Sequence, residues 1–122
     1  MTIDSITTPG VRVCTMDDLE VERGRAALVD GEQVALFLLA DGSVHAVDNL
    51  DPFSGAHVMS RGIVGSRGDA PTVASPLHKQ VFDLRTGTCL ETHGKPDAAV
   101  RVWSVAVVDR DVHVAAPRGG AS

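Results

Sequence analysis

Apolar and polar residues alternate along this chain in short runs, with the period of two that is typical of β-strands. The alternation is regular at residues 12–15 and 100–103, where β-branched side chains recur at every second position. Valine, which favours the pleated surface of a sheet, occurs eighteen times. The pattern therefore predicts a succession of short strands, each with one face turned to a core.

Paired runs of this kind are joined by short polar turns, which indicates β-hairpins. In the clearest case two apolar runs flank Asp41 and Gly42, a dipeptide that tolerates positive φ angles. The predicted hairpins cover residues 33–47, 81–90 and 104–114. Hairpins without long helical patterns between them predict an all-β fold of antiparallel sheets, a small sandwich or barrel.

Two stretches interrupt the strand pattern. Residues 48–70 form a long connection rich in Gly, Ser and Asp, and residues 75–80 form a shorter loop after the strand-like residues 71–74. Because long loops in a compact domain commonly carry function, these two loops are the expected location of a site. A single helical turn is predicted at residues 16–19, with Thr15 as its N-cap.

The length, 122 residues, is close to the commonest size of a single domain. With 43% hydrophobic and 22% charged residues, the composition is that of an ordinary globular fold. We expect one folded domain at residues 11–115, between flexible ends at residues 1–10 and 116–122.

Charge and hydropathy exclude several classes of partner. The formal net charge is -5, the basic residues are scattered, and only one Trp, three Phe and no Tyr are present, which argues against nucleic-acid binding. The longest apolar run, residues 34–40, is too short to cross a bilayer, and residues 1–4 lack the basic and apolar pattern of a signal peptide. We therefore expect a cytoplasmic protein that contacts neither nucleic acid nor membrane.

The two cysteines, Cys14 and Cys89, both lie in strand-like surroundings. A thiol there packs as a small apolar side chain, and nothing nearby in the sequence would depress its pKa or favour a disulfide. Both are predicted to be core thiols.

The two loops carry a family resemblance. Residues 46–56 (AVDNLDPFSGA) and 75–84 (SPLHKQVFDL) resemble the two cluster-binding loops of Rieske [2Fe–2S] domains. In that register Asp51 and Ser75 stand at the two cysteine positions and Phe53 at one histidine position. Only His78 keeps a ligand type, and Lys79 stands where the family has glycine.

A Rieske cluster needs two thiolates on one iron and two imidazoles on the other. Asp51 and Ser75 offer hard oxygen donors in place of soft thiolates, and Cys14 and Cys89 lie outside both loops. The degenerate positions therefore predict a chain that binds no cofactor and no metal. Ser75, His78 and Asp51 do not predict a hydrolase either, because the serine lacks a glycine-flanked elbow; no catalytic residue is assigned.

A Rieske-like domain without its ligands resembles the small subunits of assimilatory NAD(P)H-dependent nitrite reductases. The resemblance extends over residues 11–115 and is most specific at residues 47–65 and 74–90. It implies a non-redox polypeptide bound to a large catalytic subunit, which would carry FAD, a [4Fe–4S] cluster and sirohaem and reduce nitrite to ammonium. This chain has neither a Gly-x-Gly-x-x-Gly dinucleotide motif nor a cysteine set for such a cluster.

Two alternatives use the same loops. One is a free-standing Rieske-type ferredoxin, which would bind iron and acid-labile sulfide. The other is a Rieske-derived binding module that serves another oxidoreductase.

Phe53 allows two interpretations. It either fills the space of the lost cluster and pins the loops together, or it belongs to an exposed apolar tip, with Pro52 and Leu77, that docks on the large subunit. Lys79 is grouped with this tip as a partner-binding candidate. Charges that would stand at its rim are Arg61 and Arg67.

The five histidines are predicted to be mostly structural. His45 and His113 lie in strands, where a lone histidine is usually a sheet residue. His57, His78 and His93 lie near the loops and, if they met, would suit an adventitious metal. For His78 we favour a hydrogen bond that holds its loop against the neighbouring one.

Overall fold

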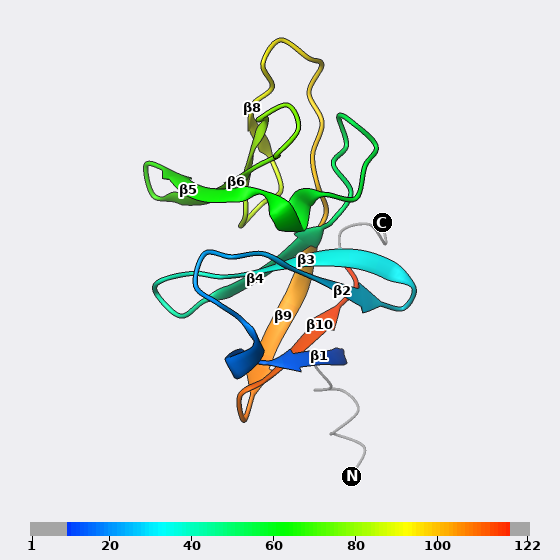
Figure 1. Cartoon of the computed structure of the whole chain (residues 1–122), viewed down its shortest axis with the longest axis vertical. Helices are drawn as coiled ribbons and strands as arrows, with labels where there is room; N and C mark the ends of the chain where they lie inside the picture. The colour runs from blue at the N-terminus through cyan, green and yellow to red at the C-terminus, as the bar shows by residue number, and fades with distance from the viewer. Residues whose placement is uncertain (1–9, 118–122) are drawn as a thin grey trace.

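Residues 10–117 are described by the computed structural model, and they fold into ten strands and two turns of 3-10 helix (Figure 1). In chain order the elements are β1 (Val11–Thr15), η1 (Met16–Asp18), β2 (Arg25–Val29), β3 (Glu32–Leu38), β4 (Val44–Asp48), η2 (Met59–Arg61), β5 (Ile63–Arg67), β6 (Ala70–Ala74), β7 (Val81–Asp83), β8 (Cys89–Glu91), β9 (Val102–Val108) and β10 (Asp111–Ala115). The all-β prediction is confirmed.

In this part of the chain no helix has the length and apolar character needed to span a membrane. The ends predicted to be flexible lie almost entirely outside the described residues.

Six strands form an antiparallel sheet in the order β1-β10-β9-β4-β3-β2. The two edge strands, β1 and β2, contact each other, so this sheet curls into an open barrel. The predicted hairpins at residues 33–47 and 104–114 are β3–β4 and β9–β10. In the second, Asp109 and Arg110 have φ angles of 51° and 69°, which a two-residue primed turn requires.

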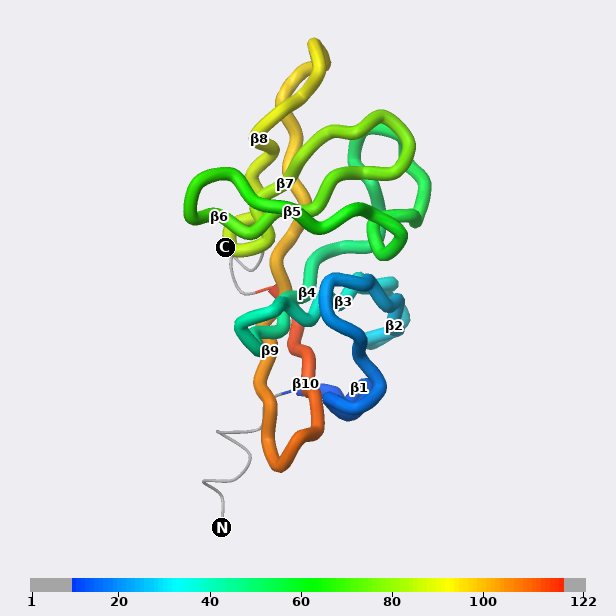
Figure 2. The backbone as a smooth tube through the Cα atoms, turned by 60° about the vertical axis from the view of Figure 1, so that its left-hand side comes forward, coloured from blue at the N-terminus to red at the C-terminus, as the bar shows by residue number. Residues whose placement is uncertain are grey.

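The other four strands form a smaller antiparallel sheet, β5-β6-β7-β8, at one end of the barrel (Figures 1 and 2). The predicted hairpin at residues 81–90 is β7–β8. The prediction of a single connection over residues 48–70 is wrong, because this stretch contains η2 and all of β5. Strand β5 is a mostly exposed edge strand with Gly65 and Ser66 at its centre, so its own sequence favours a strand only weakly, and pairing with β6 supplies its order.

Strand β3 separates two hydrophobic cores. Leu36 faces the barrel interior and the next residue, Phe37, faces the smaller sheet; both are 0% exposed. Burial on both faces explains why this strand is a continuous apolar run rather than an alternating one. The loops of the smaller sheet pack against the second core.

The cysteines confirm their prediction as core thiols. Cys14 packs in the barrel and Cys89 in the second core, and both are free. Burial raises the pKa of each thiol, which keeps both in the unreactive protonated form. The predicted helical turn is η1, where the backbone N–H of Thr15 donates to Oδ2 of Asp18 at 2.9 Å.

Candidate functional site

Three loops meet at the end of the molecule away from the barrel (Figure 1). Loop A (residues 49–58) follows β4, loop B (residues 75–80) joins β6 to β7, and loop C (residues 92–101) joins β8 to β9. Loops A and B contain the four degenerate ligand positions. Loop C was not predicted to be a functional loop, because the sequence offers no motif there, although its His93 was named as a possible ligand of an adventitious metal.

The base of loop A is held by a buried asparagine. Asn49 is 2% exposed, and its Nδ2 donates to Oε1 of Gln33 at 3.0 Å and to the backbone oxygen of His57 at 3.2 Å. Its Oδ1 accepts the backbone N–H of Ser60 at 2.7 Å. With three bonds, one side chain ties both ends of the loop to the barrel.

The neighbouring Asp48 anchors the end of loop C to the same strand. Its Oδ1 accepts the indole N–H of Trp103 at 2.9 Å, and its Oδ2 accepts Nε of Arg101 at 2.9 Å. The guanidinium also pairs with Glu32 and lies 5.5 Å from the centroid of the Trp103 ring. Hydrogen bonds to Asp48 and Glu32 raise the pKa of Arg101. Because these two carboxylates and the Trp103 ring already occupy the guanidinium, Arg101 is a structural side chain and not a free binding group.

Asp51 and Ser75 meet where loops A and B touch. Both side chains are 0% exposed, and the Ser75 hydroxyl donates to Oδ2 of Asp51 at 2.6 Å. The other carboxylate oxygen, Oδ1, accepts the backbone N–H of Phe53 at 2.8 Å, and Oγ of Ser75 accepts that of Leu77 at 3.3 Å. A buried hydrogen bond to a carboxylate contributes about 1.5–3 kcal/mol, so this pair is a strong link between the loops.

Phe53, at a degenerate histidine position, turns partly inward. Its ring is half-buried against the second core, with its centroid 6.0 Å from that of Phe82 and the ring planes tilted by 45°. This tilted arrangement is a favourable aromatic contact. Phe53 thus pins loop A to β7 while part of the side chain stays open to solvent.

His78, at the fourth position, points to solvent and makes no hydrogen bond within residues 10–117. The predicted contact is made instead by His93 of loop C, whose Nε2 lies 2.9 Å from the backbone oxygen of Lys79. Lys79 has a φ angle of 65°, a left-handed conformation that costs energy for any residue except glycine. The prediction for His78 is wrong because a sequence does not show which side of a loop a side chain faces.

These residues do not fit a [2Fe–2S] cluster. The two side chains at the cysteine positions are oxygen donors already bonded to each other, and the aromatic ring of Phe53 cannot ligate. Nowhere in residues 10–117 are three His, Cys, Asp or Glu side chains arranged to hold a metal ion, and His57, His78 and His93 do not form such a group. Ser75 donates to the carboxylate and not to an imidazole, so no hydrolytic triad is built.

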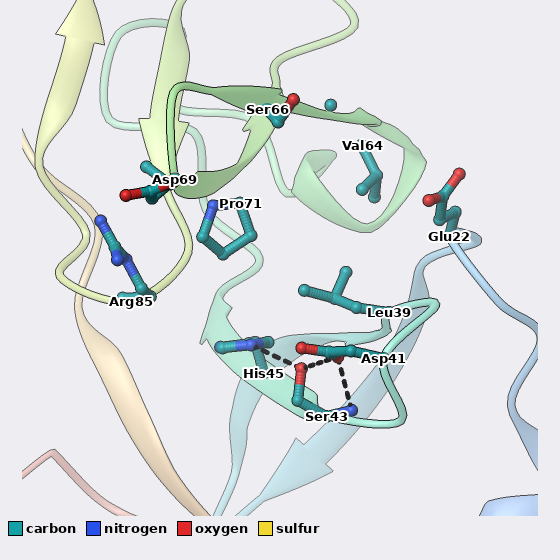
Figure 3. Close-up of a pocket in the computed structure, with 12 residues that line it drawn as sticks. Glu22, Leu39, Asp41, Ser43, His45, Val64, Ser66, Asp69, Pro71 and Arg85 are labelled. Atoms are coloured by element: carbon teal, nitrogen blue, oxygen red, sulfur yellow. Dashed lines mark hydrogen bonds between the residues drawn. The ribbon is translucent and has the colours of Figure 1, made fainter.

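A second polar cluster lies away from the loops, in a cleft of about 440 Å³ between the β3–β4 turn and the β5–β6 hairpin (Figure 3). The Ser43 hydroxyl donates to Oδ1 of Asp41 at 2.6 Å, and its oxygen lies 3.1 Å from Nε2 of His45. Burial lowers the pKa of His45. In a catalytic triad the histidine lies between the serine and the acid, whereas here Ser43 lies between Asp41 and His45, so the cluster braces the turn and does not activate the serine.

The fold and the two loops define a Rieske-like domain. Residues 11–115 match the sequence profile of the Rieske-like [2Fe-2S] domain family, and the chain belongs to this family, within it to the small subunits of nitrite reductase. It is 44% identical over 80 residues to the nitrite reductase (NADH) small subunit of Salmonella typhimurium, covering 65% of this chain and 74% of that protein. The crystal structure of a Mycobacterium tuberculosis protein assigned as an NADH-dependent nitrite reductase small subunit is 50% identical, with a TM-score of 0.79 over 85% of this chain and 91% of that one.

A third relative has a different architecture. The nitrite reductase [NAD(P)H] large subunit of Klebsiella oxytoca is 40% identical over 106 residues, which are 87% of this chain. The chain spans only 11% of the length of that protein. In Klebsiella, therefore, a domain of this kind is part of the large-subunit polypeptide itself.

Proposed function

We propose that this chain is a non-redox accessory subunit of a cytoplasmic NAD(P)H-dependent nitrite reductase and binds the large catalytic subunit. The observation that carries the proposal is the Klebsiella large subunit, in which a domain 40% identical to this chain is covalently joined to the larger polypeptide. Fusion in one protein makes association of the two separate chains in another a direct expectation. The Salmonella typhimurium relative supports the same proposal, because it is a nitrite reductase (NADH) small subunit that is a separate chain.

In this proposal the redox chemistry belongs to the partner. FAD, a [4Fe–4S] cluster and sirohaem would lie on the large subunit and carry electrons from NADH or NADPH to nitrite for its six-electron reduction to ammonium. The oxygen donors Asp51 and Ser75 and the inward-facing ring of Phe53 support a role without electron transfer for this chain.

The docking surface we propose consists of Pro52, Phe53, Leu77 and Lys79, here called the docking tip. Leu77 is 47% exposed, Pro52 and Phe53 are half-buried, and Lys79 is exposed and pairs with no carboxylate of residues 10–117. An exposed leucine beside two half-buried apolar side chains, with a cation at the edge, is typical of the centre and rim of an interface.

The experiment is affinity capture of the large subunit by the full chain, from cells grown on nitrate, with the dissociation constant measured on the purified pair. Leu77→Asp is expected to weaken binding at least about tenfold, because it places a charge in the apolar centre. The matched control is Leu28→Asp, on edge strand β2 of the barrel, where the leucine is 66% exposed. Equal loss in both variants would move the interface away from the docking tip, and no capture by the unaltered chain would refute the accessory-subunit proposal.

The ferredoxin alternative makes a different prediction for the isolated chain. A Rieske ferredoxin would contain iron and acid-labile sulfide and show a visible absorption band. For this chain we expect less than about a tenth of an equivalent of iron after anaerobic purification, and a colourless solution. Stoichiometric iron and sulfide would favour the alternative.

A further inference from the structure

Asp51 and Ser75 have a geometry that goes beyond the mere loss of a cluster. Asp51 and Ser75 stand at the positions of the two cysteines that share one iron in a Rieske centre. Side chains at these two positions therefore converge on a single point. In this chain they still converge, 24 residues apart in sequence, and their oxygens lie 2.6 Å from each other. A direct hydrogen bond thus occupies the place of a metal bridge.

The same two side chains also hold the backbone of the docking tip. Oδ1 of Asp51 accepts the N–H of Phe53, and Oγ of Ser75 accepts the N–H of Leu77. Each is a local turn in which a side chain bonds the backbone two residues further on. One buried pair therefore fixes the two loops relative to each other and also the exact backbone that presents Phe53 and Leu77.

We infer that Asp51 and Ser75 are positioning residues for large-subunit binding: their hydrogen bond replaces the iron as the link between loops A and B and holds Phe53 and Leu77 in the docking geometry. The inference rests on the proposed function. It means that the binding surface is complete without any metal, so that affinity for the large subunit does not depend on iron supply or on the redox state of this chain.

The decisive variants alter the link but not the exposed surface. Ser75→Ala removes the donor, and the exchanged pair Asp51→Ser with Ser75→Asp restores a hydroxyl opposite a carboxylate in reverse order. Both residue types support the same local turn, so the exchange keeps the bonds to Phe53 and Leu77. Ser104→Ala, at an exposed site in β9, is the matched control for loss of a hydroxyl.

Two readouts separate positioning from simple stability. In the isolated full chain, hydrogen exchange at the amides of Phe53 and Leu77 is expected to accelerate at least about tenfold in Ser75→Ala, while amides in β3 stay protected. Affinity for the purified large subunit is expected to fall about tenfold and to recover to within about threefold in the exchanged pair. Treating the unaltered chain with a chelator is expected to change neither value.

The outcomes are distinct. Unchanged affinity in Ser75→Ala overturns the inference and leaves the proposed function intact, and so does lost affinity that the exchanged pair fails to restore although it folds. If Ser75→Ala does not fold, Asp51→Asn, which keeps the size and the local turn, replaces it with the same expected direction. Failure of the unaltered chain to bind the large subunit refutes the proposed function itself, while the exchange rates still report on the link between the loops.

Discussion

At the scale of single residues, the loops combine strain with strong local bonding. Lys79 keeps a left-handed backbone conformation, with φ at 65°, at a position where glycine would be free of cost. Strain of this kind persists only where surrounding contacts hold it, here the bond between His93 and the Lys79 carbonyl. The side chain is exposed and forms no ion pair within the described part of the chain, which leaves it available for the partner contact proposed above.

Lys79→Gly is therefore expected to separate stability from binding. The free energy of unfolding should rise by about 0.5–1 kcal/mol, because the left-handed conformation no longer strains a side chain. Affinity for the large subunit should fall about threefold, which is the usual contribution of one charged side chain at the rim of an interface. Denaturant unfolding and titration with the purified large subunit measure the two effects. Asp30→Gly, at φ 52° in the β2–β3 turn, is the control that should leave affinity unchanged.

His45 predicts a pH dependence of stability. Burial holds its pKa below the ordinary value of 6.5 in the folded chain, so the unfolded chain binds a proton first as the pH falls. Its contribution to stability is complete above pH 6.5 and is lost as the pH drops toward the lower folded pKa. The melting temperature should therefore fall from pH 7.5 to about pH 5 in the unaltered chain and fall less in His45→Gln. Parallel curves for the two proteins would contradict this origin.

At the scale of elements, tight turns position the strands that carry the loops. Gly87 closes the β7–β8 hairpin with φ at 79°, and a Cβ there would lie 2.0 Å from the backbone oxygen of Val100. Gly42 closes the β3–β4 hairpin with φ at 90°, but nothing lies within 4 Å of its Cβ position. A substitution at Gly42 therefore tests backbone strain alone, whereas a substitution at Gly87 tests backbone strain together with a steric clash.

We expect Gly42→Ala to cost about 1 kcal/mol, the ordinary penalty of a left-handed alanine. Gly87→Ala should cost at least about 3 kcal/mol, because the alanine also pushes loop C away from the β7–β8 turn. Chemical denaturation of both variants tests the difference. Equal losses would mean that the close approach of Val100 is relieved by a small backbone shift.

Element prediction succeeded where the signal was local. The three hairpins follow from apolar runs around short turns, whereas β5 and β2 were not predicted. Strand β2 is an exposed edge strand with Leu28 66% exposed, and its order comes from pairing with β3. Edge strands carry weak patterns because only one neighbour and one face constrain their side chains.

At the scale of the whole molecule, the barrel core and the second core lie on opposite faces of the barrel sheet. Strand β4 adds Ala46 to one core and Val47 to the other, and most of the shared boundary is formed by β3. Residues of β3 lie alternately in the two cores, so unfolding of β3 would expose both cores to solvent. The two sheets should therefore unfold together in one transition.

Leu36→Ala removes a side chain from the barrel core and Phe37→Ala removes one from the second core. Each should lower the free energy of unfolding by about 3–4 kcal/mol. In both variants the fluorescence of Trp103 and the far-ultraviolet circular dichroism should give the same midpoint. Loss of amide protection in β6 and β7 of Phe37→Ala, with the Trp103 signal still native, would show two independent units instead.

The candidate site was predicted in part. The four degenerate positions, Asp51, Phe53, Ser75 and His78, were identified from residue types in a loop register. What their side chains do was not, because exposure and partners depend on contacts with loop C and β7. The contact by which His93 holds loop B, at the backbone oxygen of Lys79, was therefore not predicted from the sequence.

By itself the sequence determined the strand periodicity, the main hairpins and the replacement of both thiolates by oxygen donors, since these depend only on residue identity and local spacing. The tertiary structure alone decided that Asp51 and Ser75 meet at 2.6 Å, that Phe53 turns toward Phe82 and that β5 is a strand. Each of these depends on segments distant along the chain being brought together by the two cores, and no local pattern encodes that approach.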